Sequence, residues 1–209
     1  MIRHFEESEE VGMVNREEFI GILRRSRIVG AIKDLDGVEE IVKSGCEIAF
    51  VLHGDIVNIQ GIVSRLKSAG KIVLVHIDLI DGLSSRDVAV DYIANNTKTD
   101  GIISTRPNIV KCAKACGLLT VQRFFVLDSM ALNNIGRQLS DSADAIEILP
   151  GIMPKIIRVL NKCVKKPIIA GGLITDSEDV QSALNAGAAA ISSSNKGLWP
   201  KLVYSSGNR

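Results

Sequence analysis

The stretch Pro167–Trp199 decides the fold: it opens with P-I-I-A-G-G-L-I-T (167–175) and closes with A-G-A-A-A-I-S-S-S-N-K-G-L-W (186–199). Ile168–Ala170 is a short apolar run that predicts a buried strand, and Ala188–Ser192 predicts the next one. Both runs end in residues that lack bulky side chains. Bare backbone N–H groups and small hydroxyls suit a phosphate dianion, because a ligand approaches the backbone closely only where side chains are small. Two such loops are typical of the phosphate site after strands seven and eight of a (β/α)8 barrel.

These two loops supply the candidate phosphate-binding residues. Either loop alone is also explained as a tight turn, but their coincidence on consecutive strands favours a phosphate site. Charge-assisted hydrogen bonds contribute about 1.5–3 kcal/mol each, so about four or five such donors suffice for micromolar binding. The candidates are Gly171, Gly172, Ser193, Ser194 and Asn195.

Upstream of this stretch, apolar runs rich in β-branched residues alternate with amphipathic helical patterns. The runs are continuously apolar, which indicates strands buried on both faces of a parallel sheet. Repeated βα units predict an α/β fold, a single (β/α)8 TIM barrel, with an open doubly wound sheet as the alternative. The helix after the second strand is expected to begin at Asp55. The eight runs begin near Ile28, Glu47, Ile72, Gly101, Leu119, Ala145, Ile168 and Ala188.

The two ends of the chain differ from this repeat. Residues 1–15 are acidic and have no apolar period, so we expect a flexible tail, followed by the barrel domain over 16–209. A capping-box pattern at Asn15–Glu18 predicts a helix over 16–25 that plugs the bottom of the barrel. Only a short segment follows Asn195, so we expect the last helix to be short or distorted.

The composition indicates one reduced domain. The chain has 209 residues, 46% of them hydrophobic, which fits one domain with a sizeable core. Its formal net charge of +1 gives no indication of a polyanionic partner. Cys112 and Cys116 lie four apart on a predicted helix and are expected to be packing residues instead of a zinc site. The chain has no bilayer-spanning apolar run and no signal-peptide pattern. We therefore expect a cytoplasmic protein without membrane contact, metal or other cofactor.

Polar residues recur at the carboxyl ends of the predicted strands, where a barrel places its chemistry. Glu147 lies between Ile146 and Ile148, and strand alternation turns it to the opposite face, into the barrel mouth. A buried glutamate needs a partner, for which Lys33 or Arg123 is available. A structural ion pair and a hydroxyl-binding role for Glu147 are equally compatible with this pattern.

His76 and Asp78 share a face of the third strand by the same alternation. They are candidates for binding hydroxyls or for an acid–base pair, although a histidine in an apolar strand is more often simply hydrogen-bonded in place. At the opposite ends of the strands, connections such as Ala69–Lys71 are short, and we predict no clustered chemistry there. The candidates for binding hydroxyl groups beside the phosphate are Lys33, His76, Asp78, Arg123 and Glu147.

Six motifs are distinctive when taken together. They are H-I-D-L-I-D-G-L (76–83), D-G-I-I-S-T-R (100–106), V-Q-R-F-F-V-L-D-S (121–129), I-E-I-L-P-G-I-M-P-K (146–155), I-A-G-G-L-I (169–174) and I-S-S-S-N-K-G-L-W (191–199). This combination resembles the glycerol-3-phosphate responsive antiterminators, the glycerol uptake operon antiterminator regulatory proteins, over about residues 28–199. The resemblance implies a (β/α)8 barrel of the bacterial cytoplasm that binds glycerol 3-phosphate. Such a protein then binds the leader mRNA of glycerol-utilisation genes, and polymerase reads through a terminator.

Under this resemblance the protein is a non-enzymatic sensor with no catalytic residues. The two small-residue loops hold the phosphate of glycerol 3-phosphate, and the hydroxyl-binding candidates hold its glycerol moiety. The RNA half has no support from an aromatic-rich strand motif, a G-x-x-G loop or a basic repeat. Charges on helices usually form a solvated face; the candidates for RNA binding are nevertheless the basic residues around the sixth helix, Lys155, Arg158, Lys162, Lys165 and Lys166.

An enzyme is the alternative, because the same phosphate loops serve a phosphosugar or glycerophosphate TIM-barrel isomerase, aldolase or prenyltransferase. Its acid–base pair would be His76 with Glu147. No obvious Schiff-base lysine or nucleophile stands at a strand end, which favours the sensor. Apolar helix faces and Trp199 are also compatible with a homodimer. The chain departs from the family at Arg25–Arg27 and in its acidic head, which leaves the role of the amino-terminal end open.

Overall fold

Eight parallel strands close into a barrel in the computed structural model, which describes residues 14–84 and 86–202. Each strand pairs with the next, and β8 pairs with β1 to close the sheet. The predicted single (β/α)8 barrel is confirmed, and the open-sheet alternative is wrong. The strands are β1 (Ile28–Ile32), β2 (Ile48–Val51), β3 (Ile72–His76), β4 (Gly101–Ser104), β5 (Leu119–Phe125), β6 (Ala145–Leu149), β7 (Ile168–Gly171) and β8 (Ala190–Ser193).

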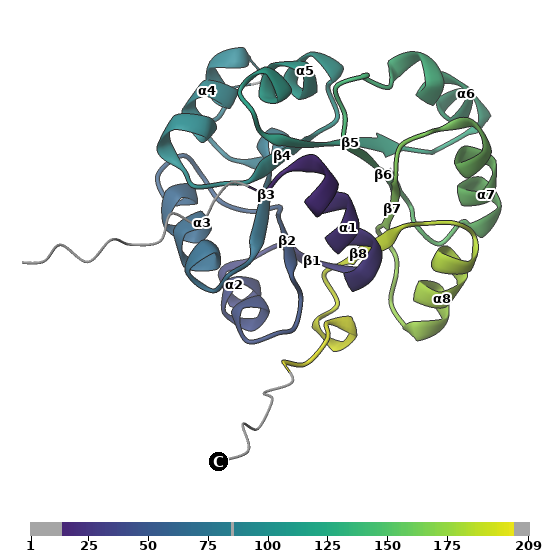
Figure 1. Cartoon of the computed structure of the whole chain (residues 1–209), viewed down its shortest axis with the longest axis horizontal. Helices are drawn as coiled ribbons and strands as arrows, with labels where there is room; N and C mark the ends of the chain where they lie inside the picture. Colours follow the sequence, from purple (N-terminus) through teal and green to yellow (C-terminus); the bar gives the residue numbers. More distant parts are fainter. Residues whose placement is uncertain (1–13, 85, 203–209) are drawn as a thin grey trace, which may run out of the picture.

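Helices connect consecutive strands and form an outer ring around the barrel (Figure 1). They are α2 (Leu35–Val42), α3 (Ile59–Ser68), α4 (Asp87–Asn96), α5 (Pro107–Ala115), α6 (Ser129–Gln138), α7 (Pro154–Cys163) and α8 (Ser177–Asn185). The predicted start of α3 at Asp55 is wrong. Asp55 instead caps a turn, because its Oδ1 accepts from the N–H groups of Val57 at 2.7 Å and Asn58 at 2.9 Å. The helix therefore begins one turn later.

Helix α1 (Arg16–Ser26) lies across the amino-terminal end of the barrel, which confirms the predicted plug (Figure 1). Asn15 caps it, with its Oδ1 accepting from the N–H of Glu18 at 3.0 Å. Phe19 and Leu23 are fully buried and pack against inward-facing side chains of the strands. This end of the barrel is therefore closed by apolar packing, and any opening lies at the other end.

The segments before and after the barrel strands agree with the predictions in part. After β8 the chain forms only the 3-10 turn η2 (Lys196–Leu198), which confirms a short last helix. Trp199 is buried and its Nε1 donates to the carbonyl of Ser193 at 2.9 Å, so the suggestion that it serves a dimer is wrong. Residues 1–13 of the predicted tail lie outside the described residues. Within the described ranges, no helix is long and apolar enough to cross a membrane.

Candidate functional site

A cavity of about 260 Å³ lies in the barrel mouth, at the carboxyl ends of β1, β2 and β5 to β8. Half of its lining consists of predicted site residues: Lys33, Arg123, Glu147, Gly172, Ser193 and Ser194. The sequence reasoning missed the other half: Ala31, Leu52, Leu149, Leu173, Ile174 and Ser192. Strand alternation was the available signal for three of these, because Ala31, Leu149 and Ser192 stand two positions from Lys33, Glu147 and Ser194.

An ion pair between β5 and β6 forms part of the cavity wall. Arg123 and Glu147 are directly opposite each other in the sheet register, and Arg123 Nε donates to Glu147 Oε2 at 2.6 Å. The hydroxyl of Ser192 donates to the other carboxylate oxygen at 2.5 Å. The side chains of Arg123 and Glu147 are only 7% and 1% exposed. Glu147 therefore points inward as predicted, and of its two candidate partners Arg123 is the one it binds.

Lys33 lies at the rim of the same cavity. It is exposed and forms no ion pair with any residue in the described ranges. Because Arg123 is neutralised by Glu147, Lys33 supplies the uncompensated positive charge of the cavity. An anion that enters the mouth gains its attraction from this side chain and from backbone dipoles.

The two small-residue loops lie beside each other, after the paired strands β7 and β8. Gly172 has a φ of +75°, in the left-handed region that favours glycine. Gly171 is needed for a different reason: an added Cβ would lie 2.5 Å from Ser192 Oγ and 2.6 Å from Glu147 Oε1. Gly171 thus makes room for the buried carboxylate and does not line the cavity, whereas Gly172 does.

Part of the polar capacity of these loops is used inside the protein. Ser193 Oγ donates to the carbonyl of Ile174 at 3.0 Å, and Asn195 Nδ2 donates to the carbonyl of Thr175 at 2.7 Å. These bonds tie the β8 loop to the β7 loop, and Asn195 does not line the cavity. Several donors make no hydrogen bond with a described residue and stay available: the N–H groups of Gly172, Leu173 and Ser194 and the hydroxyl of Ser194.

His76 lies near Arg123 and beside Asp78, but neither His76 nor Asp78 lines the cavity. Burial, together with the charge of Arg123, lowers the pKa of His76 to about 4, so the imidazole is neutral at physiological pH. Its Nδ1 is 4.0 Å from Asp78 Oδ2 and has no hydrogen-bond partner among residues 14–84 and 86–202. Asp78 is held by the N–H of Thr105 at 2.7 Å and the hydroxyl of Ser104 at 3.0 Å. His76 is therefore a buried, neutral imidazole outside the cavity lining, and its Nδ1 is unsatisfied within the described residues.

The family model for glycerol-3-phosphate responsive antiterminators matches residues 28–199. The chain belongs to this family. It is 40% identical over 179 residues to the uncharacterized protein YgcP of Escherichia coli (strain K12), a match that covers 85% of this chain and 94% of that protein.

Solved antiterminator structures share the barrel. The glycerol uptake operon antiterminator regulatory protein from Listeria monocytogenes str. 4b F2365 is 36% identical, with a TM-score of 0.77 over 82% of this chain and 94% of that one. A glycerol uptake operon antiterminator-related protein from Thermotoga maritima MSB8 is 34% identical, with a TM-score of 0.73 over 82% and 96%. Enzymes such as an N-acetylmannosamine-6-phosphate 2-epimerase and a deoxyribose phosphate aldolase match at 14% and 17% identity, which shows the fold alone.

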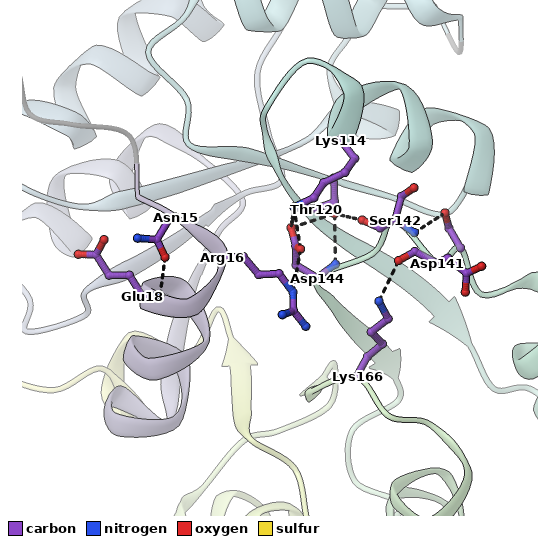
Figure 2. A network of polar contacts seen from close by, with 10 residues as sticks. Asn15, Arg16, Glu18, Lys114, Thr120, Asp141, Ser142, Asp144 and Lys166 are labelled. Carbon is purple, nitrogen blue, oxygen red and sulfur yellow. Dashed lines mark hydrogen bonds and ion pairs between the residues drawn. The ribbon is translucent and has the colours of Figure 1, made fainter.

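The protein has a second polar cluster at the opposite, amino-terminal end of its barrel (Figure 2). Asp144 is 1% exposed, and its Oδ1 pairs with Lys114 Nζ at 2.8 Å and Arg16 Nε at 3.3 Å. Its Oδ2 accepts from the N–H of Thr120 at 3.0 Å. The prediction that this end lacks clustered chemistry is wrong. All of these groups are paired with one another, so the cluster has the form of a structural network.

The candidate RNA-binding residues lie along α7 and the loop after it. Lys155, Arg158, Lys162 and Lys165 are exposed. Lys166 is half-buried, and its Nζ donates to the backbone carbonyl of Asp141 at 2.9 Å (Figure 2). The set runs from the start of α7, at the mouth, to the amino-terminal end of the barrel.

The cysteines do not form a metal site in the part of the chain that the structure describes. No group of three or more His, Cys, Asp or Glu side chains is arranged to hold an ion there. Cys112 packs against the core beneath the helices, as predicted, but Cys116 is exposed, so its assignment as a packing residue is wrong. Burial is the main cause that raises the pKa of the Cys112 thiol to about 11.

Proposed function

We propose that this protein is a non-enzymatic sensor that binds glycerol 3-phosphate in the barrel mouth. In the bound state it binds the leader mRNA of glycerol-utilisation genes in the cytoplasm and lets polymerase read past a terminator. Family membership supports the ligand and the regulatory role. The observation that carries the proposal is the cavity, which combines unbonded backbone N–H groups, an uncompensated cation at Lys33 and a buried polar pair.

The phosphate end of the ligand fits the side of the cavity formed by the β7 and β8 loops. A dianion placed there accepts from the N–H groups of Gly172, Leu173 and Ser194, and the exposed Lys33 faces it from β1. Each charge-assisted bond contributes about 1.5–3 kcal/mol before the entropic cost of binding. Gly171 and Asn195 contribute indirectly, because they shape and tie these loops.

The glycerol end fits the Arg123–Glu147 pair. A glycerol hydroxyl is both a donor and an acceptor, and a carboxylate beside a guanidinium offers both complements. Glu147 keeps lone pairs free after accepting from Arg123 and Ser192, because an ionised carboxylate has about four acceptor positions. Leu52 and Leu149 give this part of the cavity apolar walls, which strengthen the polar contacts by excluding water.

The enzyme alternative has less support. Its acid–base pair needs His76 and Glu147 on either side of a substrate, but of the two only Glu147 lines the cavity. Incubation with glycerol phosphates and trioses in deuterated water tests this by NMR. We expect no exchange of carbon-bound protons, and exchange above the rate in buffer would favour an enzyme.

Calorimetry with glycerol 3-phosphate, glycerol and inorganic phosphate tests the ligand. We expect Gly172→Asp to weaken glycerol 3-phosphate binding at least 100-fold, because a carboxylate would stand beside the phosphate. Gly172→Ala is the matched control: it carries the same strain at a φ of +75° without the charge, and we expect it to bind within about tenfold of wild type. No binding by the wild-type protein, or equal affinity of the two variants, would contradict the proposal.

A further inference from the structure

A near-neutral chain concentrates positive charge on one sector of its outer wall. We call residues 129–167 the α6–α7 sector; they comprise α6, the buried strand β6, α7 and the connecting loops. Its three acidic residues are Asp144 and Glu147, both buried in ion pairs, and Asp141, which is exposed. The charge that faces solvent is therefore positive, although the whole chain carries a formal net charge of only +1. The six basic residues of the sector are Arg137, Lys155, Arg158, Lys162, Lys165 and Lys166.

These cations are not neutralised by neighbours. Arg25 and Arg65, by contrast, each pair with an exposed carboxylate, at 2.7 and 2.9 Å. Among residues 14–84 and 86–202, none of the six cations of the α6–α7 sector forms an ion pair, and Lys166 donates to a backbone carbonyl instead. Unpaired surface cations keep their charge available for a polyanion, whose bound counterions they displace.

Three of the cations form a ridge on α7. Lys155, Arg158 and Lys162 stand at helical spacing i, i+3 and i+7, so they share one face over a length of about 10 Å. Lys165 and Lys166 extend the ridge toward the amino-terminal end of the barrel. Helix α6, with Arg137 exposed near its end, lies next to α7 in the outer ring (Figure 1). A row of charges on a convex helix suits the regularly spaced phosphates of a nucleic acid.

The sector offers charge but no surface on which bases stack. Residues 129–167 contain no Phe, Tyr or Trp. Proteins read unpaired RNA mainly by stacking bases on aromatic side chains, whereas they bind double-stranded RNA through its shape and its phosphates. We propose that the α6–α7 sector is the RNA-binding surface and that it binds a base-paired stem. This inference rests on the proposed function and adds to it the surface and the form of the RNA.

The position of the sector also links it to the ligand. The loop between β6 and α7 packs against the proposed phosphate loop, with the N–H of Gly151 donating to the carbonyl of Gly172 at 3.1 Å. The fit is close, because a Cβ on Gly151 would lie 2.8 Å from backbone atoms of Ala170 and Gly171. A shift of Gly172 on phosphate binding would therefore be passed to the start of the basic helix α7.

Fluorescence anisotropy with labelled RNA tests the surface. The probes are the leader transcript of a glycerol-utilisation operon, an RNA hairpin and an unpaired RNA of equal length, each with and without glycerol 3-phosphate. The test variant is Arg158→Glu with Lys162→Glu. The matched control, Lys98→Glu with Lys111→Glu, makes the same charge change at exposed positions in the α4–α5 region. Both variants should bind glycerol 3-phosphate as wild type does.

We expect the α7 double variant to bind the leader transcript at least 30-fold more weakly than wild type, and the control to bind within about threefold. The slope of log affinity against log salt should fall by about 1.5 in the α7 variant, at about 0.7–0.9 per lost phosphate contact. Equal affinity of the two variants would contradict the proposal that the α6–α7 sector binds the RNA. Unpaired RNA bound as tightly as the hairpin would contradict the proposal that the bound RNA is a base-paired stem. A wild-type protein that binds no leader transcript under either condition would instead contradict the proposed function.

Discussion

The two ends of the barrel use charge in opposite ways. At the amino-terminal end, buried carboxylates accept hydrogen bonds from lysines and backbone N–H groups, and α1 closes the barrel interior by apolar packing. At the mouth, Lys33 and the N–H groups of Gly172, Leu173 and Ser194 have no partner in the described residues. A saturated network stabilises a fold, whereas unsatisfied groups retain free energy of interaction for a ligand. The difference separates the structural end of the barrel from the end where we propose that the ligand binds.

The structural end uses one arrangement twice. Asp100, just before β4, accepts from Lys67 Nζ at 2.7 Å and from the N–H of Val73 on β3 at 2.8 Å. Asp144, just before β6, repeats this arrangement: it accepts from Lys114 Nζ at 2.8 Å and from the N–H of Thr120 on β5 at 3.0 Å. In both cases one carboxylate joins a strand to its neighbour and to the helix between the preceding strands. The repeat indicates that these aspartates fasten adjacent βα units together.

Breaking this end should have the largest effect on stability. We expect Asp144→Ala to lower the free energy of unfolding by about 3–5 kcal/mol, because it leaves buried donors without their acceptor. Urea denaturation measures the loss, and calorimetry on the folded fraction should show unchanged glycerol 3-phosphate affinity. Glu39→Ala removes an exposed carboxylate paired with Arg65 and is the control, with little expected change. A similar loss of unfolding free energy in both variants would contradict the structural role of Asp144.

At the mouth, the next largest effect should depend on pH. The pKa of His76 is lowered from its ordinary 6.5 to about 4, so the unfolded chain takes up a proton between these values and the folded chain does not. Stability is therefore complete above pH 6.5 and falls as the pH falls toward 4, at most by about 1.4 kcal/mol per pH unit. Between pH 7 and pH 4, His76→Gln should lose about 2–3 kcal/mol less than wild type.

Urea denaturation at several pH values measures this difference, and His53→Gln controls for the removal of a histidine elsewhere. The charged groups that bear on His76 are Arg123 and Asp78, which act in opposite directions, while burial is the largest cause of the shift. Parallel pH profiles for wild type and His76→Gln would mean that the imidazole is hydrated in solution and is not the unsatisfied group described above.

The comparison of the two ends also marks what the sequence predicts. All eight strands and the plug helix follow from continuous apolar runs and one capping pattern, because burial on both faces leaves a direct trace in composition. Strand alternation correctly predicts that the side chain of Glu147 points into the barrel. Its choice of Arg123 over Lys33 was not predictable, because it depends on the register between β5 and β6, which the closed barrel sets.

Other features were missed because their partners lie far away in the chain. Asp144 binds Lys114 and Thr120, which precede it by 30 and 24 residues, and also the more distant Arg16, and no pattern in its own loop indicates these partners. Small polar residues were ambiguous for a different reason: a serine or asparagine either closes a loop or faces a ligand. Ser193 and Asn195 turn their side chains to loop contacts, while Ser194 keeps its hydroxyl available.

The smallest expected effect compares one residue at each end. Arg27, before β1, and Leu173, after β7, have φ values of 58° and 60°, in the left-handed region. A side chain there destabilises the folded state by about 1–2 kcal/mol, and glycine removes this strain. Glycine also loses more backbone entropy on folding, which offsets about 0.5–1 kcal/mol of the gain. Arg27→Gly and Leu173→Gly should each raise the free energy of unfolding by about 0.5–1 kcal/mol.

Their effects on the ligand should differ, which separates the two ends most finely. Leu173 lines the cavity, so a glycine there leaves a looser phosphate loop that must be ordered on binding. We expect Leu173→Gly to weaken glycerol 3-phosphate about threefold to tenfold and Arg27→Gly to leave its affinity unchanged, by calorimetry. An equal loss in both variants would mean that strain at the closed end is transmitted through the barrel, and that the two ends are not independent.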